Sequence, residues 1–125
     1  RAVHGTLAIW CMDAGRLLSA AVGKEVSRAL CRNYEGDRYQ MLAVCRNPKF
    51  PSALIEVGYM TSVEEYEQIT KSSEIEKAAR GIADGVLQYF KKQGEFIKLS
   101  DEKSNAADAE KTNMKDSLSD GQTLS

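Results

Sequence analysis

Glu56 is the residue whose type and surroundings most clearly indicate a chemical role. It interrupts an apolar run, residues 53–59, that is typical of a strand buried on both faces. Moving an ionised carboxylate out of water is costly unless a cation, a metal or hydrogen-bond donors compensate for it, so proteins accept it mostly at working sites. Gly58 lies on the same strand face and leaves room for another group to approach. We interpret Glu56 as a catalytic acid or base; the alternative is a structural ion pair with an arginine.

The residues around Glu56 also follow a recognisable order. Residues 46–62 read RNPKFPSALIEVGYMTS, and a closing helix ends with GVLQYF at residues 85–90. In this order the segment resembles the zinc-dependent N-acetylmuramoyl-L-alanine amidases of the amidase 3 type, which are bacterial cell-wall hydrolases. The sequence departs from that pattern at Thr61-Ser62, where the family has Ser-Asn. The resemblance reaches back more weakly to about Gly5 and covers the C-terminal part of the family's catalytic domain.

The resemblance implies hydrolysis of the amide that joins N-acetylmuramic acid to L-alanine of the stem peptide. In the family, a Zn²⁺ held by two His and one Glu activates a water molecule, and a second Glu, at the position of Glu56, transfers its proton to the leaving amine. The implied cofactor is therefore zinc, the implied partner is peptidoglycan, and the implied location is the cell envelope or the exterior.

The metal ligands of the family lie upstream of the part of the domain that this sequence resembles, with His4 as the one alternative candidate. His4 is the one histidine, and its neighbours do not reproduce a ligand segment of the family. We therefore assign no metal ligand and expect the chain to be inactive unaided. The function is predicted to be that of an incomplete amidase catalytic domain; the alternative is a truncated, non-catalytic relative that binds cell-wall fragments or has a structural role.

Other residues are weaker candidates for a role in catalysis or binding. Arg46 is predicted to contact substrate by lining the cleft, with an ion pair to Glu56 as the alternative. The three cysteines, Cys11, Cys31 and Cys45, lack Cys-x-x-Cys spacing and are expected to be small buried residues. Tyr59 is expected to be cleft wall or core, because the family has Phe there.

Composition sets outer bounds on the function. The 125 residues carry a formal net charge of −1 and the sequence pI is about 5.9, so nothing in the charge balance favours nucleic acid or an anionic membrane as a partner. No apolar run has the length of a membrane span, and the first residues lack the pattern of a signal peptide. A start without Met is expected for a segment of a longer polypeptide or a truncated copy.

The elements expected to position Glu56 alternate between strand and helix. Strands are predicted at residues 6–10, 39–45 and 52–59, with a helix that starts from Asp13 between the first two. Two further helices are predicted from capping-box spacings at Ser62 and Ser73. This order indicates an α/β fold with a partial, mostly parallel sheet and flanking helices. Glu56 would then lie toward the carboxyl end of its strand, where such sheets bind ligands.

The domain organisation follows from a change of composition near the C-terminus. Residues 1–97 are predicted to form the amidase-like portion, and residues 98–125 a disordered polar tail that cannot bury enough apolar surface to offset its ordering entropy. A partial sheet also has an edge without its neighbours. Self-association through that open edge is therefore expected.

Overall fold

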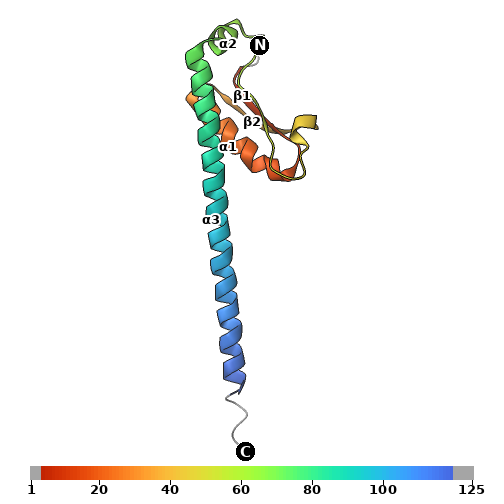
Figure 1. Cartoon of the computed structure of the whole chain (residues 1–125), viewed down its shortest axis with the longest axis vertical. Coiled ribbons are helices and arrows are strands. Elements are labelled where there is room, and N and C mark those ends of the chain that lie inside the picture. The colour runs from red at the N-terminus through yellow and green to blue at the C-terminus, as the bar shows by residue number, and fades with distance from the viewer. Residues whose placement is uncertain (1–3, 120–125) are drawn as a thin grey trace, which may run out of the picture. The chain divides into compact units, whose positions relative to one another are not determined.

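The computed structural model describes residues 4–119, with side chains through Lys111. It divides into two units, Arg1–Phe90 and Lys91–Ser125. The secondary structure is that of an α/β protein, as the sequence predicts (Figure 1). The elements in chain order are β1 (Thr6–Trp10), α1 (Asp13–Ala29), β2 (Tyr34–Tyr39), a 3-10 turn (Ala43–Cys45), β3 (Leu54–Glu56), α2 (Val63–Ile69) and α3 (Ser72–Ser119).

The sheet has the strand order β2-β1-β3 and is mixed. β1 and β2 are parallel, whereas β3 runs antiparallel to β1 with Ala8 opposite Ile55. The prediction of a mostly parallel sheet is therefore wrong for β3. The reason lies in the connections: α1 is a crossover helix that returns the chain for a parallel β2, but residues 40–53 contain only a 3-10 turn. Without a crossover helix, β3 enters the sheet in the opposite direction.

The first strand lies where the sequence predicts it, at residues 6–10, but the second does not. Residues 39–45 are predicted as a strand, whereas β2 ends at Tyr39 and Cys45 closes the 3-10 turn. Gly36, with φ of +99°, lies within β2, where the register with β1 shifts. β2 is an edge strand in which residues 34–37 are half-buried and only Arg38 and Tyr39 are exposed, and the apolar run after it is not a strand. The third strand is also shorter than the predicted residues 52–59.

The helices begin close to the predicted positions. Ser62 caps α2, where its Oγ accepts from the backbone N–H of Glu65 at 3.4 Å, which confirms the predicted helix start. The Glu65 carboxylate accepts from the N–H groups of Gly5 and Tyr59 rather than from that of Ser62, so the capping box is not complete. α3 starts at Ser72, so Ser73 is not its cap. Met12 rather than Asp13 occupies the N-cap of α1. At the other end of α1, Cys31 adopts φ of +52° and the N–H groups of Cys31 and Arg32 close a Schellman motif.

Glycines allow the layers of the first unit to approach closely. A Cβ on Gly23 of α1 would lie 2.8 Å from the Cβ of Ala8, so α1 packs tightly on β1. Gly81 and Gly85 of α3 contact the backbone of α1, and a Cβ on Gly81 would lie 2.7 Å from the Cα of Val26. α1 and α3 therefore form one helical layer, and this layer packs against one face of the sheet. One core cluster consists of Val22, Val26 and Leu30, with Leu18, Ile55, Val57, Ala78 and Val86 packed against them. Leu7, Ala8 and Ile9 of β1 are buried as well.

The second unit contains the remainder of α3, from Lys91. The structure has residues 98–119 in this helix, although the sequence predicts a disordered tail from residue 98. The side chains described from residue 98 to residue 111 are all exposed, so the helix there depends on local terms such as the Lys111–Asp108 pair at 3.8 Å. The boundary after residue 97 stays a prediction. Within residues 4–119, no helix combines the length and apolarity needed to cross a membrane.

Tyr34 provides a test of the packing between α1 and the sheet. Burial, and secondarily the charge of Asp37, raises the pKa of Tyr34 from 10.0 to about 12. A raised pKa in the folded state means that the neutral phenol stabilises the fold fully below pH 10, and that this contribution is lost as the pH rises from 10 to about 12. Among the described residues, the phenol oxygen has no hydrogen-bond partner. Tyr34→Phe should therefore leave stability at neutral pH almost unchanged and weaken the alkaline loss.

The measurement is the midpoint of urea unfolding between pH 8 and pH 12 for the wild type, Tyr34→Phe and Tyr39→Phe. Tyr39 is an exposed phenol at the end of the same strand and serves as the control. Some alkaline loss should remain in Tyr34→Phe, because burial also raises the pKa of Tyr59 and Cys45. Equal alkaline slopes for Tyr34→Phe and the wild type would contradict the prediction.

Candidate active site

Glu56 is the last residue of β3 and lies opposite Leu7 of β1. Ile55 and Val57 pack against the core of the helical layer, so the alternation of a strand directs Glu56 to the opposite face of the sheet. The run from Ala53 to Tyr59 is half-buried throughout rather than buried on both faces. Glu56 is thus held by a strand but remains accessible from the face without helices α1 and α3.

The end of the sheet at which Glu56 lies differs from the expected one. Because β3 is antiparallel to β1, the carboxyl end of β3 meets the amino end of β1, next to Gly5. The rule that ligands bind beyond the carboxyl ends of parallel strands therefore does not apply to this end of β3. What places Glu56 at an accessible position is the end of β3 itself, after which the chain turns toward α2.

Glu56 makes no salt bridge or hydrogen bond to any side chain in the described part of the chain. The four ion pairs there all join residues three apart in sequence, and none includes Glu56. Arg46 is exposed at the end of the 3-10 turn, and its side chain makes no hydrogen bond or ion pair with Glu56. The alternative of a structural Glu56–Arg46 pair is therefore not what the structure shows. Arg46 as a substrate contact stays a prediction.

Tyr59 and Glu35 are the polar groups that accompany Glu56. The Tyr59 phenol donates to Glu35 Oε2 at 3.4 Å, and Glu35 also lies 3.6 Å from the guanidinium of Arg38. Burial, then the negative charges of Glu35 and Glu56, raise the pKa of Tyr59. The phenol therefore stays protonated at neutral pH and available as a hydrogen-bond donor next to two carboxylates.

Glu65 is a buried carboxylate that the sequence analysis did not single out. Its Oε1 accepts from the backbone N–H of Gly5 and its Oε2 from that of Tyr59, each at 2.8 Å. The side chain thus connects the start of β1 to the segment after β3, the two stretches that flank Glu56. The capping-box spacing at Ser62 indicated a helix start but gave no sign that the Glu65 side chain would be buried.

Gly58 has a structural reason within this chain. A Cβ there would collide with Nη1 of Arg32 and lie 3.2 Å from Oε2 of Glu65. The same Nη1 donates to the carbonyl oxygen of Val57 at 2.7 Å. The space that the missing side chain leaves is therefore filled by Arg32 and Glu65, on the α2 side of the segment.

The described residues do not supply a catalytic metal site. Among their side chains, no group of three or more His, Cys, Asp or Glu is arranged to hold a metal ion. His4 is exposed and lines a polar hollow of about 290 Å³ that is separate from Glu56. Glu65, which lines the same hollow, is already engaged by two backbone N–H groups. These residues do not fit a three-ligand zinc site.

The cysteines are free, and only Cys45 is fully buried, so the expectation of burial is wrong for exposed Cys31.

A family model described as N-acetylmuramoyl-L-alanine amidase matches residues 2–88. The chain belongs to this amidase family. Among curated relatives, the probable cell wall amidase LytH of Staphylococcus epidermidis is 24% identical over 87 residues, which are 70% of this chain and 30% of LytH. The family membership agrees with the resemblance read from residues 46–90.

Solved amidase structures share the fold of the first unit. The catalytic domain of CwlV, an N-acetylmuramoyl-L-alanine amidase from Bacillus (Paenibacillus) polymyxa, matches with a TM-score of 0.67 and 28% identity, over 72% of this chain and 50% of that one. The amidase AmiC2 of Nostoc punctiforme matches with a TM-score of 0.66 and 28% identity, over 71% of this chain and 49% of AmiC2. The chain described here therefore spans about half of the length of these two solved chains and 30% of the length of LytH.

Proposed function

We propose that this chain supplies the Glu56-bearing part of a catalytic domain that hydrolyses the amide between N-acetylmuramic acid and L-alanine of peptidoglycan. The observation that carries the proposal is the position of Glu56 within the matched residues 2–88. Its carboxylate ends β3, lies on the face away from the helical layer, and has no cationic partner in the described part of the chain. A carboxylate held in this way is free to exchange protons with a bound substrate and water.

Glu56 acts in this proposal as a general base and then as a general acid. It accepts a proton from the water whose oxygen attacks the amide carbonyl, and it returns that proton to the nitrogen as the carbon–nitrogen bond breaks. The products are the carboxylate of the muramic acid lactyl group and the free amine of the L-alanyl peptide. Arg46, exposed after the 3-10 turn, is proposed to contact an anionic group of the substrate.

In this proposal the zinc ion is held by residues of the amidase domain that lie outside this chain. The family resemblance implies a Zn²⁺ ion that activates water, but the described residues do not fit a three-ligand site. The ligands would therefore belong to the part of an amidase domain that this chain does not cover. Peptidoglycan as substrate places the proposed activity in the cell envelope or outside the cell.

The test compares this chain alone with a joined protein. The joined protein combines this chain with the half of the CwlV catalytic domain that the chain does not cover. We expect the chain alone to bind no stoichiometric Zn²⁺ and to release no L-alanyl peptide from muramyl peptide, and the joined protein to do both. A joined protein that is folded by circular dichroism and loaded with Zn²⁺, but releases no peptide, would contradict the proposal.

The missing ligand set also favours a second function, that of a non-catalytic relative that binds cell-wall fragments. Cosedimentation with purified sacculi separates the two. Retention of the chain on sacculi, combined with a folded and Zn²⁺-loaded joined protein that cleaves nothing, would support the binding function. Cleavage by the joined protein would support the catalytic one.

A further inference from the structure

Two of the three cysteines lie at the carboxyl end of β1. Cys11 directly follows this strand, and Cys45 closes the 3-10 turn. Cys45 is fully buried, and its Sγ donates to the carbonyl oxygen of Ile9 at 3.8 Å. Ile9 precedes Cys11 by two residues, which is about 6.6 Å along a strand. The Cys45 thiol therefore lies against the last part of β1, close to Cys11.

The connection between β2 and β3 explains why the two cysteines meet. β2 and β3 lie on opposite sides of β1, β2 ends beside Trp10, and β3 begins at the same end of β1. Residues 40–53 must therefore cross the carboxyl end of β1, and Cys45 lies within them. The N–H of Gln40 donates to the carbonyl oxygen of Trp10 at 2.9 Å, so the crossing starts next to the residue that precedes Cys11.

The electrostatics of Cys45 agree with this geometry. Burial raises the pKa of the Cys45 thiol, the charge of Cys11 raises it further, and a hydrogen bond from the Leu54 backbone lowers it. An influence of the Cys11 charge requires the two sulfur atoms to be near each other. Cys11 is half-buried whereas Cys45 is buried, so Cys11 is the thiol that a dissolved oxidant reaches first.

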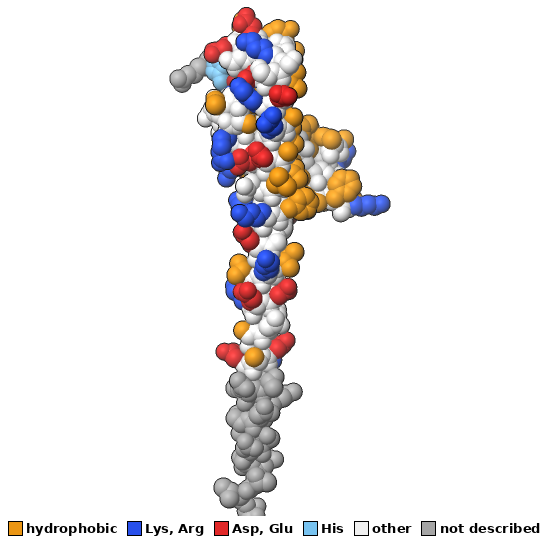
Figure 2. Space-filling view, turned by 60° about the vertical axis from the view of Figure 1, so that its left-hand side comes forward, with side chains coloured by type: hydrophobic (Ala, Val, Ile, Leu, Met, Phe, Trp, Pro, Cys, Tyr) orange, Lys and Arg blue, Asp and Glu red, His pale blue; other side chains and the backbone are white. Residues whose placement is uncertain are grey.

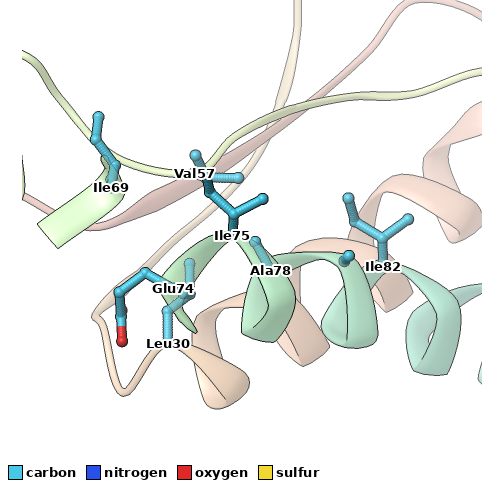
Figure 3. A pocket seen from close by; sticks show the side chains of 8 residues that line it. Leu30, Val57, Ile69, Glu74, Ile75, Ala78 and Ile82 are labelled. Carbon is cyan, nitrogen blue, oxygen red and sulfur yellow. The ribbon is translucent and has the colours of Figure 1, made fainter. Parts of the chain in front are cut away.

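Cys31 lies at the other end of β1. It follows Leu30, whose side chain lines an apolar hollow of about 280 Å³ together with Ile75 of α3 (Figure 3). Cys31 itself lines a polar hollow with Gly5, the residue before β1. Gly5 and Cys11 are separated by the whole strand, five residues or about 17 Å. The folded chain thus keeps Cys31 away from the other two thiols.

A bond between Cys11 and Cys45 would act on a segment that burial holds only weakly. Met41 and Val44 are exposed, and Figure 2 shows hydrophobic side chains left at the surface of the first unit. Cys45 is the buried residue of the 3-10 turn. Attaching it covalently to the end of β1 would restrain the turn and, with it, the exposed Arg46 that follows.

We propose that Cys11 and Cys45 form an intramolecular disulfide in an oxidising environment, and that this bond locks the turn that precedes Arg46. The oxidant is a small disulfide such as oxidised glutathione. The Cys11 thiolate attacks one of its sulfur atoms and releases one glutathione, and the Cys45 thiolate then attacks the Cys11 sulfur and releases the second. The two cysteines lose two protons and two electrons, and the disulfide of the oxidant is reduced to two thiols. A location outside the cell, where disulfides persist, rests on the proposed function, whereas the bond itself does not.

The experiment treats the native chain with oxidised glutathione and maps the bonded cysteines by mass spectrometry after proteolysis. Cys11 and Cys45 are 34 residues apart, the largest separation among the three possible pairs. Loop closure in an unfolded chain favours the shorter separations, so this pair should be the rarest in concentrated urea but should exceed the other two at least about tenfold in the native chain.

Three serine variants and a protease provide the controls. Cys31→Ser is the matched control and should form the bond with the yield of the wild type. Cys45→Ser should carry one glutathione on Cys11, and Cys11→Ser should leave the buried Cys45 thiol free. Tryptic cleavage after Arg46 should be at least about tenfold slower in the oxidised chain and recover with dithiothreitol, while cleavage after Lys103 in the second unit stays unchanged.

Each outcome decides the proposal independently of catalysis. A dominant Cys11–Cys45 bond that Cys31→Ser preserves, with slower cleavage after Arg46, supports it even if the joined protein hydrolyses nothing. Pairing of either thiol with Cys31, mixed disulfides with glutathione alone, or cross-links between chains would overturn it. Unchanged cleavage after Arg46 in the oxidised chain would overturn the claim that the bond locks the turn.

Discussion

Glu56→Gln should abolish amide hydrolysis by the joined protein while its fold and its Zn²⁺ content stay the same. The amide of Gln has nearly the same shape as the carboxylate but cannot accept a proton from water. General acid–base catalysis by one side chain typically contributes about 10²- to 10⁴-fold to the rate, and a loss of this size is expected in kcat. Because Glu56 makes no salt bridge or side-chain hydrogen bond in the described part of the chain, the substitution removes no structural contact that would confuse the result.

The matched control for this prediction is Glu76→Gln. Glu76 is an exposed residue of α3 far along the chain from β3, and its loss of charge should leave kcat unchanged. Release of L-alanyl peptide from muramyl peptide, followed by chromatography, gives the rates, and metal analysis gives the Zn²⁺ content. Unchanged turnover in Glu56→Gln would remove this residue from the mechanism, whereas loss of Zn²⁺ would show a role in metal binding instead.

The sequence identified Glu56 because a charge within an apolar strand is unusual, but the same reasoning overlooked Glu65. Glu65 stands among polar residues of α2, where a glutamate is expected to be exposed. Its burial depends on the backbone N–H groups of Gly5 and Tyr59, which are 60 and 6 residues away in sequence. No local pattern records such a long-range contact. Buried acids that bind backbone groups are therefore found from the structure, whereas those in apolar strands can be found from the sequence.

The fold shows the same division between local and long-range information. β1 and the α2 cap follow from local patterns and lie where they were predicted. The direction of β3 was predicted wrongly, because the rule for alternating strands and helices assumes a crossover helix that residues 40–53 lack. The position of β2 was predicted wrongly because the prediction looked for an apolar run. β2 is an edge strand, and most of its residues are polar. Gly81 and Gly85 contact α1 directly, a role that the apolar periodicity of α3 does not reveal.

Glu65→Ala should destabilise the first unit more than other single substitutions on α2. The side chain is buried, and its loss leaves the N–H groups of Gly5 and Tyr59 without their acceptor. An unsatisfied buried polar group costs about 1–3 kcal/mol, so we expect the free energy of unfolding to fall by about 2–4 kcal/mol. That is a large part of the stability of a small domain, which is typically about 5–15 kcal/mol. Urea unfolding followed by circular dichroism measures the change.

Two further variants separate the hydrogen bonds from other effects of Glu65. Glu64→Ala removes an exposed glutamate from the same first turn of α2 and should change the free energy of unfolding by less than about 0.5 kcal/mol. Glu65→Gln keeps one oxygen that can accept from a backbone N–H but replaces the other by a donor, so its loss should be intermediate. Equal stabilities of Glu65→Ala and Glu64→Ala would show that the two N–H groups find water instead. In that case Glu65 would not be the connection that holds the start of β1 against the segment carrying Glu56.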